Sequence, residues 1–419
     1  MTTEISTLPN GLRVVSEDMP GLETASIGVW VDVGARYESA AINGVSHLLE
    51  HMAFKGTERR SALAIAEEIE AVGGHVNAYT SREQTAYYAK VMKEDVALAV
   101  DILADILQHS TFAEEELERE RAVVVQEIAH AHDTPDDVVF DQFQEIVYPD
   151  QPLGRTILGP AAQVENYSRA VLADYMARHY RAERMVVVGA GRIEHEALVA
   201  LAGNAFDTLS NANSGNGLTA KYEGGDGRAP RELEQVHLVL GFDGIAYDDP
   251  DFYTLQLLST LLGGGMSSRL FQEIRERRGL AYAIFTFASS YTDGGVFGIY
   301  CGTGPDSLPE LTPVIADEIL KVCDAVAAQE VARARAQLKS GLLMSLESSS
   351  SRCERLGRHM LIFNRPIPIE EMVAEIDAIT AEDVVRVAAR ILRGSRPSLA
   401  ALGPVGKLEN YDRLAERFI

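Results

Sequence analysis

Two histidines and a glutamate fall within five consecutive positions of the segment VSHLLEHMAFKGT, residues 45–57. These residues are His47, Glu50 and His51. On a helix, positions i, i+3 and i+4 fall within a sector of about 100°, so the three side chains would share one face. Two imidazoles one turn apart can bind one zinc ion, and a carboxylate beside them can take a proton from a zinc-bound water. The spacing therefore indicates a hydrolytic metal site, with an apolar core helix carrying two hydrogen-bonded histidines as the alternative.

A third metal ligand is available in the segment STFAEEELERERAVVVQEIAHAH, residues 110–132. Thr111 and Glu114 form a capping-box pattern, which predicts the start of a long helix. Within this helix Glu127 follows a run of valines, and Glu120 lies about two turns earlier on the same face. Glu127 is therefore a candidate ligand, and Glu120 is a candidate support for the site. A solvated acidic helix is the alternative, although it suits the acidic start of the segment better than it suits Glu127.

The elements that must position these residues occur twice along the chain. Each half opens with an alternating strand, at residues 25–34 and 236–242, and continues with an apolar helix, a charged helix, a glycine and a further strand. Strands followed by long helices favour an α+β fold of two homologous domains, each an antiparallel-rich sheet backed by helices. The Ser-, Asn- and Gly-rich stretch 213–231 is the predicted linker between a metal-binding domain, residues 1–212, and a metal-free domain, residues 232–419.

The duplication supplies an internal control for the metal site. An offset of roughly 210 residues places Leu257 and Leu261 opposite the two histidines, and Thr260 opposite the glutamate between them. Packing alone therefore does not require histidines at these positions. Their presence in the first half indicates a chemical role.

The composition disfavours several classes of protein. The 419 residues include 62 acidic and 38 basic ones, a net charge of −24, whereas binding to a phosphate backbone needs a basic surface. No run of about 18 apolar residues indicates a membrane helix, and the first residues lack the pattern of a signal or transit peptide. Three cysteines without paired spacing fit a reducing cytoplasm. The acidity either maintains solubility or attracts basic peptides, and the net charge alone does not separate the two.

The set His47, Glu50 and His51, followed by Glu127 76 positions beyond His51, resembles the metal site of the inverzincin zinc peptidases of the pitrilysin family. The neighbouring HMAFKGT and VVVQEI are similar to segments of the catalytic β subunits of processing peptidases and of their bacterial homologues. YPDQPLGRTILG and GGGMSSRLFQEIRERRGLAY are also similar to family segments, so the resemblance covers essentially the whole chain. It implies one Zn²⁺ per chain, bound by His47, His51 and Glu127. Glu50 would be the general base, and Glu120 would support the ligands from outside.

The resemblance also implies where a peptide substrate would lie. Residues 73–91 contain glycines followed by alternating strands, and the family places Asn77 and Ala78 beside the scissile bond. For Asn77, a structural turn is the alternative. In the second half, Arg275 and Tyr282 match family residues that face the zinc and could donate to an oxyanion. By sequence alone, this segment is a helix-to-strand junction with solvated arginines.

A two-domain chain of this size resembles half of the four-domain clamshell of longer relatives. The implied assembly is a homodimer in which Arg275 and Tyr282 of one subunit complete the zinc site of the other. The implied activity is that of a zinc endopeptidase, which cleaves peptides or leader-like segments in an enclosed chamber in the cytoplasm of a bacterium. A non-catalytic scaffold subunit of the same fold is the alternative, although such subunits often lose the motif residues that this chain retains. The sequence does not decide whether the chain removes leader segments or clears peptides in general. It also leaves open whether the partner is a second copy of the chain or a paralogue.

Overall fold

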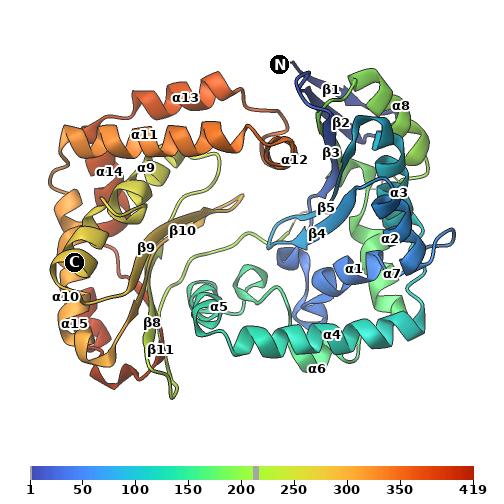
Figure 1. Cartoon of the computed structure of the whole chain (residues 1–419). Helices are drawn as coiled ribbons and strands as arrows, with labels where there is room; N and C mark the ends of the chain where they lie inside the picture. The colour runs from blue at the N-terminus through green and yellow to red at the C-terminus, as the bar shows by residue number, and fades with distance from the viewer. Residues whose placement is uncertain (1, 211–216) are drawn as a thin grey trace. The chain divides into compact units, whose positions relative to one another are not determined.

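The computed structural model describes residues 2–210 and 217–419, which form two compact units (Figure 1). Unit 1 comprises Met1–Ala129, Arg155–Leu218 and Met344–Pro366, and unit 2 comprises His130–Gly154, Thr219–Leu343 and Ile367–Ile419. The units differ from the contiguous halves 1–212 and 232–419 expected from the sequence, because residues 130–154 pack with unit 2 and residues 344–366 with unit 1. Within the expected linker 213–231, residues 213–216 lie outside the described residues, and Asp226–Pro230 form a strand.

The α-helices of the described residues are α1 to α15. In chain order they are α1 (Val45–Ala53), α2 (Ala62–Ala71), α3 (Val96–Gln108), α4 (Glu114–His132), α5 (Pro135–Val147), α6 (Ala161–Val164), α7 (Arg169–His179), α8 (His195–Ala205), α9 (Phe252–Gly263), α10 (Leu308–Val322), α11 (Ala328–Ser345), α12 (Ser349–Phe363), α13 (Ile369–Ala378), α14 (Ala381–Leu392) and α15 (Tyr411–Ala415). None of the helices in the described part of the chain is both long enough and apolar enough to cross a bilayer.

Unit 1 is built on a six-stranded sheet in the order β1-β2-β6-β3-β5-β4. Its strands are β1 (Thr3–Thr7), β2 (Arg13–Asp18), β3 (Thr24–Val31), β4 (His75–Thr80), β5 (Thr85–Met92) and β6 (Met185–Gly191). Only β2 and β6 run parallel, and the remaining pairs are antiparallel. Strand β4 is the last strand in this order and therefore lies at one edge of the sheet.

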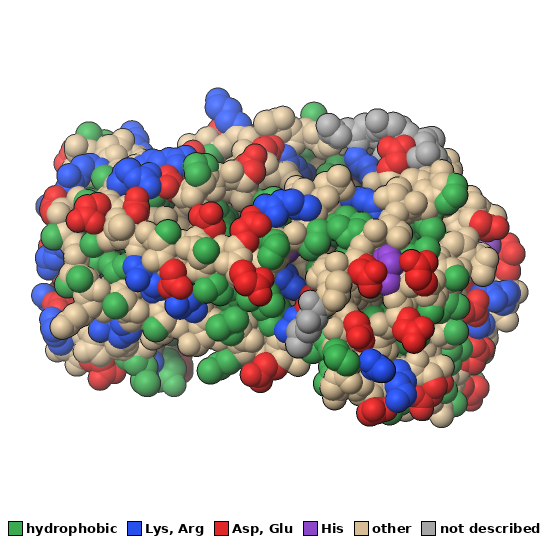
Figure 2. Space-filling view, turned by 90° about the horizontal axis from the view of Figure 1, so that it is seen from above, with side chains coloured by type: hydrophobic (Ala, Val, Ile, Leu, Met, Phe, Trp, Pro, Cys, Tyr) green, Lys and Arg blue, Asp and Glu red, His purple; other side chains and the backbone are tan. Residues whose placement is uncertain are grey.

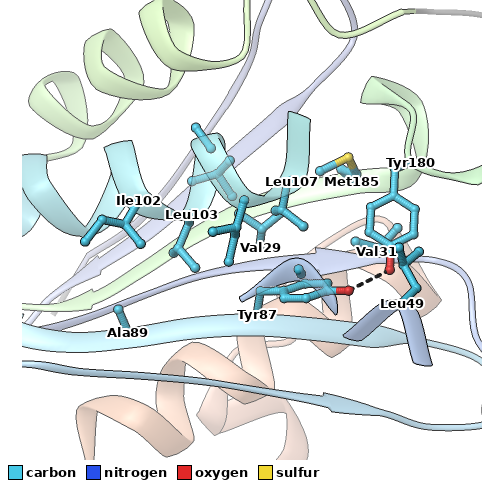
Figure 3. Packing of buried hydrophobic residues seen from close by; sticks show 14 of the residues in the cluster. Val29, Val31, Leu49, Tyr87, Ala89, Ile102, Leu103, Leu107, Tyr180 and Met185 are labelled. Atoms are coloured by element: carbon cyan, nitrogen blue, oxygen red, sulfur yellow. Dashed lines mark hydrogen bonds between the residues drawn. The ribbon is translucent and has the colours of Figure 1, made fainter. Parts of the chain in front are cut away.

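Both faces of the central strands of this sheet are covered, which explains their nearly continuous apolar sequences. On one face, Val29 and Val31 of β3 and Tyr87 of β5 pack with Leu103 and Leu107 of α3, as Figure 3 shows. In the same layer, the Tyr87 hydroxyl lies 2.9 Å from that of Tyr180. The opposite face is covered by α12, whose Cys353, Leu356 and Met360 join a second buried cluster with Trp30 and Val186. An apolar surface on both sides holds the sheet as a rigid platform for the helix that carries the histidines.

Unit 2 repeats this plan with a five-stranded sheet in the order β7-β11-β8-β10-β9. Its strands are β7 (Asp226–Pro230), β8 (Val236–Asp243), β9 (Ala283–Ser290), β10 (Gly295–Thr303) and β11 (Ser398–Gly403). Only β7 and β11 run parallel. Helices α9, α10 and α14 pack on one face, and α5 packs on the other through Val139, Phe143 and Val147.

The expected fold class is confirmed, because each unit is a mainly antiparallel sheet backed by helices. The two helices that cross between the contiguous halves, α5 and α12, hold equivalent places in the order of elements. Each buries an apolar side on the sheet of the unit that it joins. On the face of the molecule seen in Figure 2, acidic and basic side chains are interspersed with apolar ones.

Candidate metal centre

Helix α1 begins at a buried carboxylate that fixes its position. Glu38, only 1% exposed, accepts hydrogen bonds from the backbone N–H groups of Gly44 at 2.7 Å and Ser46 at 2.8 Å, and from the Asn43 amide at 2.9 Å. An anion at this end satisfies N–H groups that have no partner within the helix and favours the helix dipole. Burial raises the pKa of Glu38, while these hydrogen bonds oppose the rise. The turn itself needs glycine, because Gly44 has φ +96° and a Cβ there would lie 2.5 Å from the carbonyl oxygen of Leu158.

One side of α1 anchors it in the core and the other presents the polar residues. Leu48, Leu49 and Met52 are 0% exposed and belong to the main apolar cluster of unit 1. On the other side, the rings of His47 and His51 lie 4.7 Å apart in an edge-on arrangement. The expected grouping of the two histidines on one helix face is therefore present.

The third candidate ligand comes from α4, which passes α1 within unit 1 (Figure 1). Glu127 Oε2 lies 3.6 Å from His47 Nε2 and 3.5 Å from His51 Nε2. Tetrahedral zinc with bonds of about 2.1 Å separates its ligand atoms by about 3.4 Å. Burial and the neighbouring His51 lower the pKa of His47 to about 4, so its imidazole is neutral, as a metal ligand must be. The donor set and its spacing therefore fit a zinc ion.

Glu120 holds one of the two imidazoles from behind. Its Oε2 lies 3.0 Å from His51 Nδ1, and its Oε1 lies 2.8 Å from the Lys55 ammonium. A carboxylate at Nδ1 accepts a hydrogen bond from the N–H group there, which keeps the proton on Nδ1 and leaves the lone pair of Nε2 for a metal. Glu120 thus contacts His51, and its role as a support for the metal site stays a prediction. Lys55 was not singled out by the sequence, although it stands only four residues beyond His51.

Glu50 also has a dedicated neighbour. The hydroxyl of Thr80, the last residue of β4, donates to Glu50 Oε2 at 2.7 Å. Burial raises the pKa of Glu50, the Thr80 hydrogen bond opposes this rise, and Glu127 adds to it. The sequence did not single out Thr80, because its contact with Glu50 depends on how β4 lies against α1.

The outer edge of β4 exposes backbone groups that could pair with another strand. Ser81 N–H donates to Gln84 C=O, so ladder alternation directs the N–H and C=O of Asn77 toward β5 and those of Ala78 outward. The Asn77 side chain accepts a hydrogen bond of 2.9 Å from the Ala78 N–H. Both residues predicted to contact substrate therefore lie at an edge strand, and their role stays a prediction.

Arg275 and Tyr282 belong to unit 2. Arg275 lies in the helical turn Phe271–Arg277, and its guanidinium carbon stacks 4.8 Å above the Phe271 ring and 5.1 Å above the Tyr282 ring. Tyr282 is 74% exposed. The two residues thus form a pair with each other, and their role at a zinc site stays a prediction.

Comparison with known proteins places the site in a family context. The model of the insulinase family, peptidase family M16, matches residues 13–161, and that of the M16 inactive domain matches residues 166–338. An uncharacterized zinc protease of Rickettsia felis is 43% identical over 401 residues, covering 96% of this chain and 97% of that protein. The β subunit of the mitochondrial-processing peptidase of Bos taurus is 40% identical over 426 residues, covering 98% and 86% respectively.

A solved structure shares the fold at lower identity. A protease from Helicobacter pylori superposes with a TM-score of 0.90 at 24% identity, over 96% of this chain and 99% of that one. The sequence matches cover nearly the whole chain, and the matched N-terminal region contains His47, Glu50, His51 and Glu127. The resemblance inferred from these motifs is confirmed at the level of the family: the chain belongs to the M16 peptidases.

Proposed function

We propose that this chain is a zinc-dependent endopeptidase whose metal is held by His47, His51 and Glu127, one ion per chain. The observation that carries the proposal is the set of separations of 3.5 and 3.6 Å from the Glu127 oxygen to the two imidazole nitrogens. The names of the relatives, a zinc protease and a processing-peptidase subunit, support the same activity. A scaffold subunit would not need this donor set, nor the neighbouring carboxylate of Glu50.

Glu50 is the general base of the proposed reaction. Zinc bound to the three ligands supplies Lewis acidity, which makes a water more acidic and a peptide carbonyl more electrophilic. The Glu50 carboxylate takes a proton from the attacking water as the new C–O bond forms, and it returns the proton to the amine nitrogen as the C–N bond breaks. Thr80 donates to Oε2 of Glu50, which leaves Oε1 for the proton.

The substrate is a peptide in an extended conformation. Strand β4 lies at the edge of the sheet, and the outward C=O of Ala78 can accept a hydrogen bond from a substrate backbone. The Ala78 N–H donates to the Asn77 side chain, and a substrate carbonyl would take the place of that acceptor. Such pairing is independent of sequence, so preferences arise from pockets and charge. The proposed substrates are basic peptides, including leader-like segments, which a chain with a net charge of −24 would attract into an enclosed chamber.

The active assembly is a homodimer in the cytoplasm. Arg275 and Tyr282 of one subunit complete the site of the other, where they donate hydrogen bonds to the developing oxyanion. One chain carries both the metal ligands and this pair, so a paralogous partner is not required.

The activity is tested by mass spectrometry of the products of a peptide library, with and without a chelator. Glu50→Gln should retain stoichiometric zinc and lose cleavage by about 10²–10⁴-fold, because it removes only the base. Glu118→Gln, an exposed change on α4, is the matched control and should behave as the wild type. Full activity in Glu50→Gln would refute the mechanism, and wild-type protein without zinc or cleavage would favour the scaffold alternative.

A further inference from the structure

The carboxylate of Glu120 is held at both of its oxygens by residues of one short segment. Its Oε2 contacts His51 Nδ1 at 3.0 Å, and its Oε1 contacts Lys55 Nζ at 2.8 Å. Glu120 is 5% exposed, whereas the Lys55 side chain is 31% exposed. Lys55 follows the last turn of α1, where its N–H donates to the carbonyl of Met52. His51 and Lys55, the two residues that hold Glu120, are therefore both anchored by their backbones at the C-terminal end of α1.

A single hydrogen bond would not fix the direction of this carboxylate. A carboxyl group can rotate about its last torsion, and the preference in that torsion is broad. With only His51 as partner, the plane of the Glu120 carboxylate could turn about that contact, and the buried second oxygen would lack a partner, which costs free energy. The Lys55 ammonium satisfies that second oxygen through a charge-assisted hydrogen bond. Contacts at both oxygens then fix the plane of the carboxylate and the direction of the acceptor for His51.

We propose that Lys55 is a positioning residue of the metal centre. By binding Glu120 Oε1, it directs Oε2 to the N–H at Nδ1 of His51, and thereby holds the His51 ring with Nε2 aimed at Glu127 Oε2. This inference depends on the proposed function, because it concerns the affinity of the same site for zinc. The orientation of the His51 imidazole would then depend on the Glu120 carboxylate, and the orientation of that carboxylate on the Lys55 ammonium.

Unit 2 provides an independent comparison. The roughly 210-residue offset that relates α1 to α9 places Gly265 at the position of Lys55, and leucines at the positions of the two histidines. The copy without histidines thus has no lysine at this position. In unit 1, by contrast, the partly buried Lys55 forms an ion pair with Glu120, whose carboxylate contacts the candidate ligand His51.

The test measures the zinc dissociation constant by competition with a chromophoric chelator, together with the melting temperature of the metal-free protein. The variants are Lys55→Met, Lys55→Arg, Glu120→Gln and the double variant Lys55→Met/Glu120→Gln. The matched control is Lys93→Met, which removes an ion pair of 2.6 Å with Glu23, where both side chains are exposed. If Lys55→Met does not fold, Lys55→Ala takes its place, because it also removes the donor to Glu120.

Lys55→Met should weaken zinc binding by about tenfold, and Glu120→Gln by about 10–100-fold, as is typical of groups that orient metal ligands. The double variant should bind zinc no more weakly than Glu120→Gln, since Lys55 acts through that carboxylate. Lys55→Arg should recover most of the affinity. An unchanged constant in Lys55→Met, or a full additional loss in the double variant, overturns the inference. A wild-type chain that binds no zinc would refute the proposed function instead.

Discussion

The Thr80 hydroxyl should matter for catalysis because it donates a hydrogen bond to Glu50, the proposed base. Thr80→Val removes the donor and preserves both the size of the side chain and its preference for a strand. A hydrogen bond to a charged group contributes about 1.5–3 kcal/mol. Glu50 is partly exposed, so water can replace the lost donor in part, and the lower end of this range applies. About 1.5 kcal/mol corresponds to a decrease in kcat of about tenfold.

The assay is steady-state cleavage of a fluorogenic peptide, with the zinc content measured in the same samples. Thr80→Ser keeps the hydroxyl and serves as the control, so its kcat should stay within about twofold of the wild type. Zinc should be retained in both variants, because Thr80 contacts the base and none of the three candidate ligands. A Thr80→Val enzyme with full zinc and an unchanged kcat would show that this hydrogen bond does not position Glu50.

Three further predictions follow from the same structure. Glu50→Gln and Arg275→Ala chains should each be nearly inactive, yet a mixture should recover about a quarter of wild-type activity, since half of the dimers then hold one intact site; no recovery contradicts a site shared between subunits. Gly44→Ala should lower the free energy of unfolding by about 2–4 kcal/mol in chemical denaturation, because of the positive φ and the approach to Leu158. Burial raises the pKa of Asp32 to about 6, so the folded chain holds this proton more tightly and loses stability as the pH rises through that value. Asp32→Asn should therefore be stabilised relative to the wild type at pH 8 and show no such gain near pH 4, and an equal effect at both values would refute the sign.

The grouping of the candidate ligands could be predicted from the sequence because helical periodicity fixes which side chains share a face. His47 and His51 needed only the spacing of α1, and Glu127 needed only a long helix with a carboxylate after its valines. The contacts of Thr80 and Lys55 required the relative placement of β4, α1 and α4, which is set by long-range packing. No periodicity within one element contains that information.

That α5 packs with unit 2 and α12 with unit 1 could not be predicted, for a related reason. Each helix has an apolar face, and Val139 and Phe143 of α5 match Cys353 and Leu356 of α12 as buried contacts. An apolar face requires a sheet to cover, but it does not specify which of two similar sheets in a duplicated chain that will be. Contiguous halves were the simplest assignment, and the packing follows a different connectivity.

The difference between the two copies of the metal-site helix has a physical explanation in what covers each of them. In unit 2, α13 and α14 pack against α9, and Leu257 and Leu261 are 0% and 5% exposed. By the order of elements, the counterpart of α13 in unit 1 is α6, which has four residues instead of ten. A helix side packed against other helices favours apolar residues, whereas His47 and His51 of α1 lie beside the carboxylates of α4. The shorter α6 is therefore one difference between the surroundings of the two helices, and the carboxylates of α4 beside the histidines are a second, which gives the imidazoles polar partners.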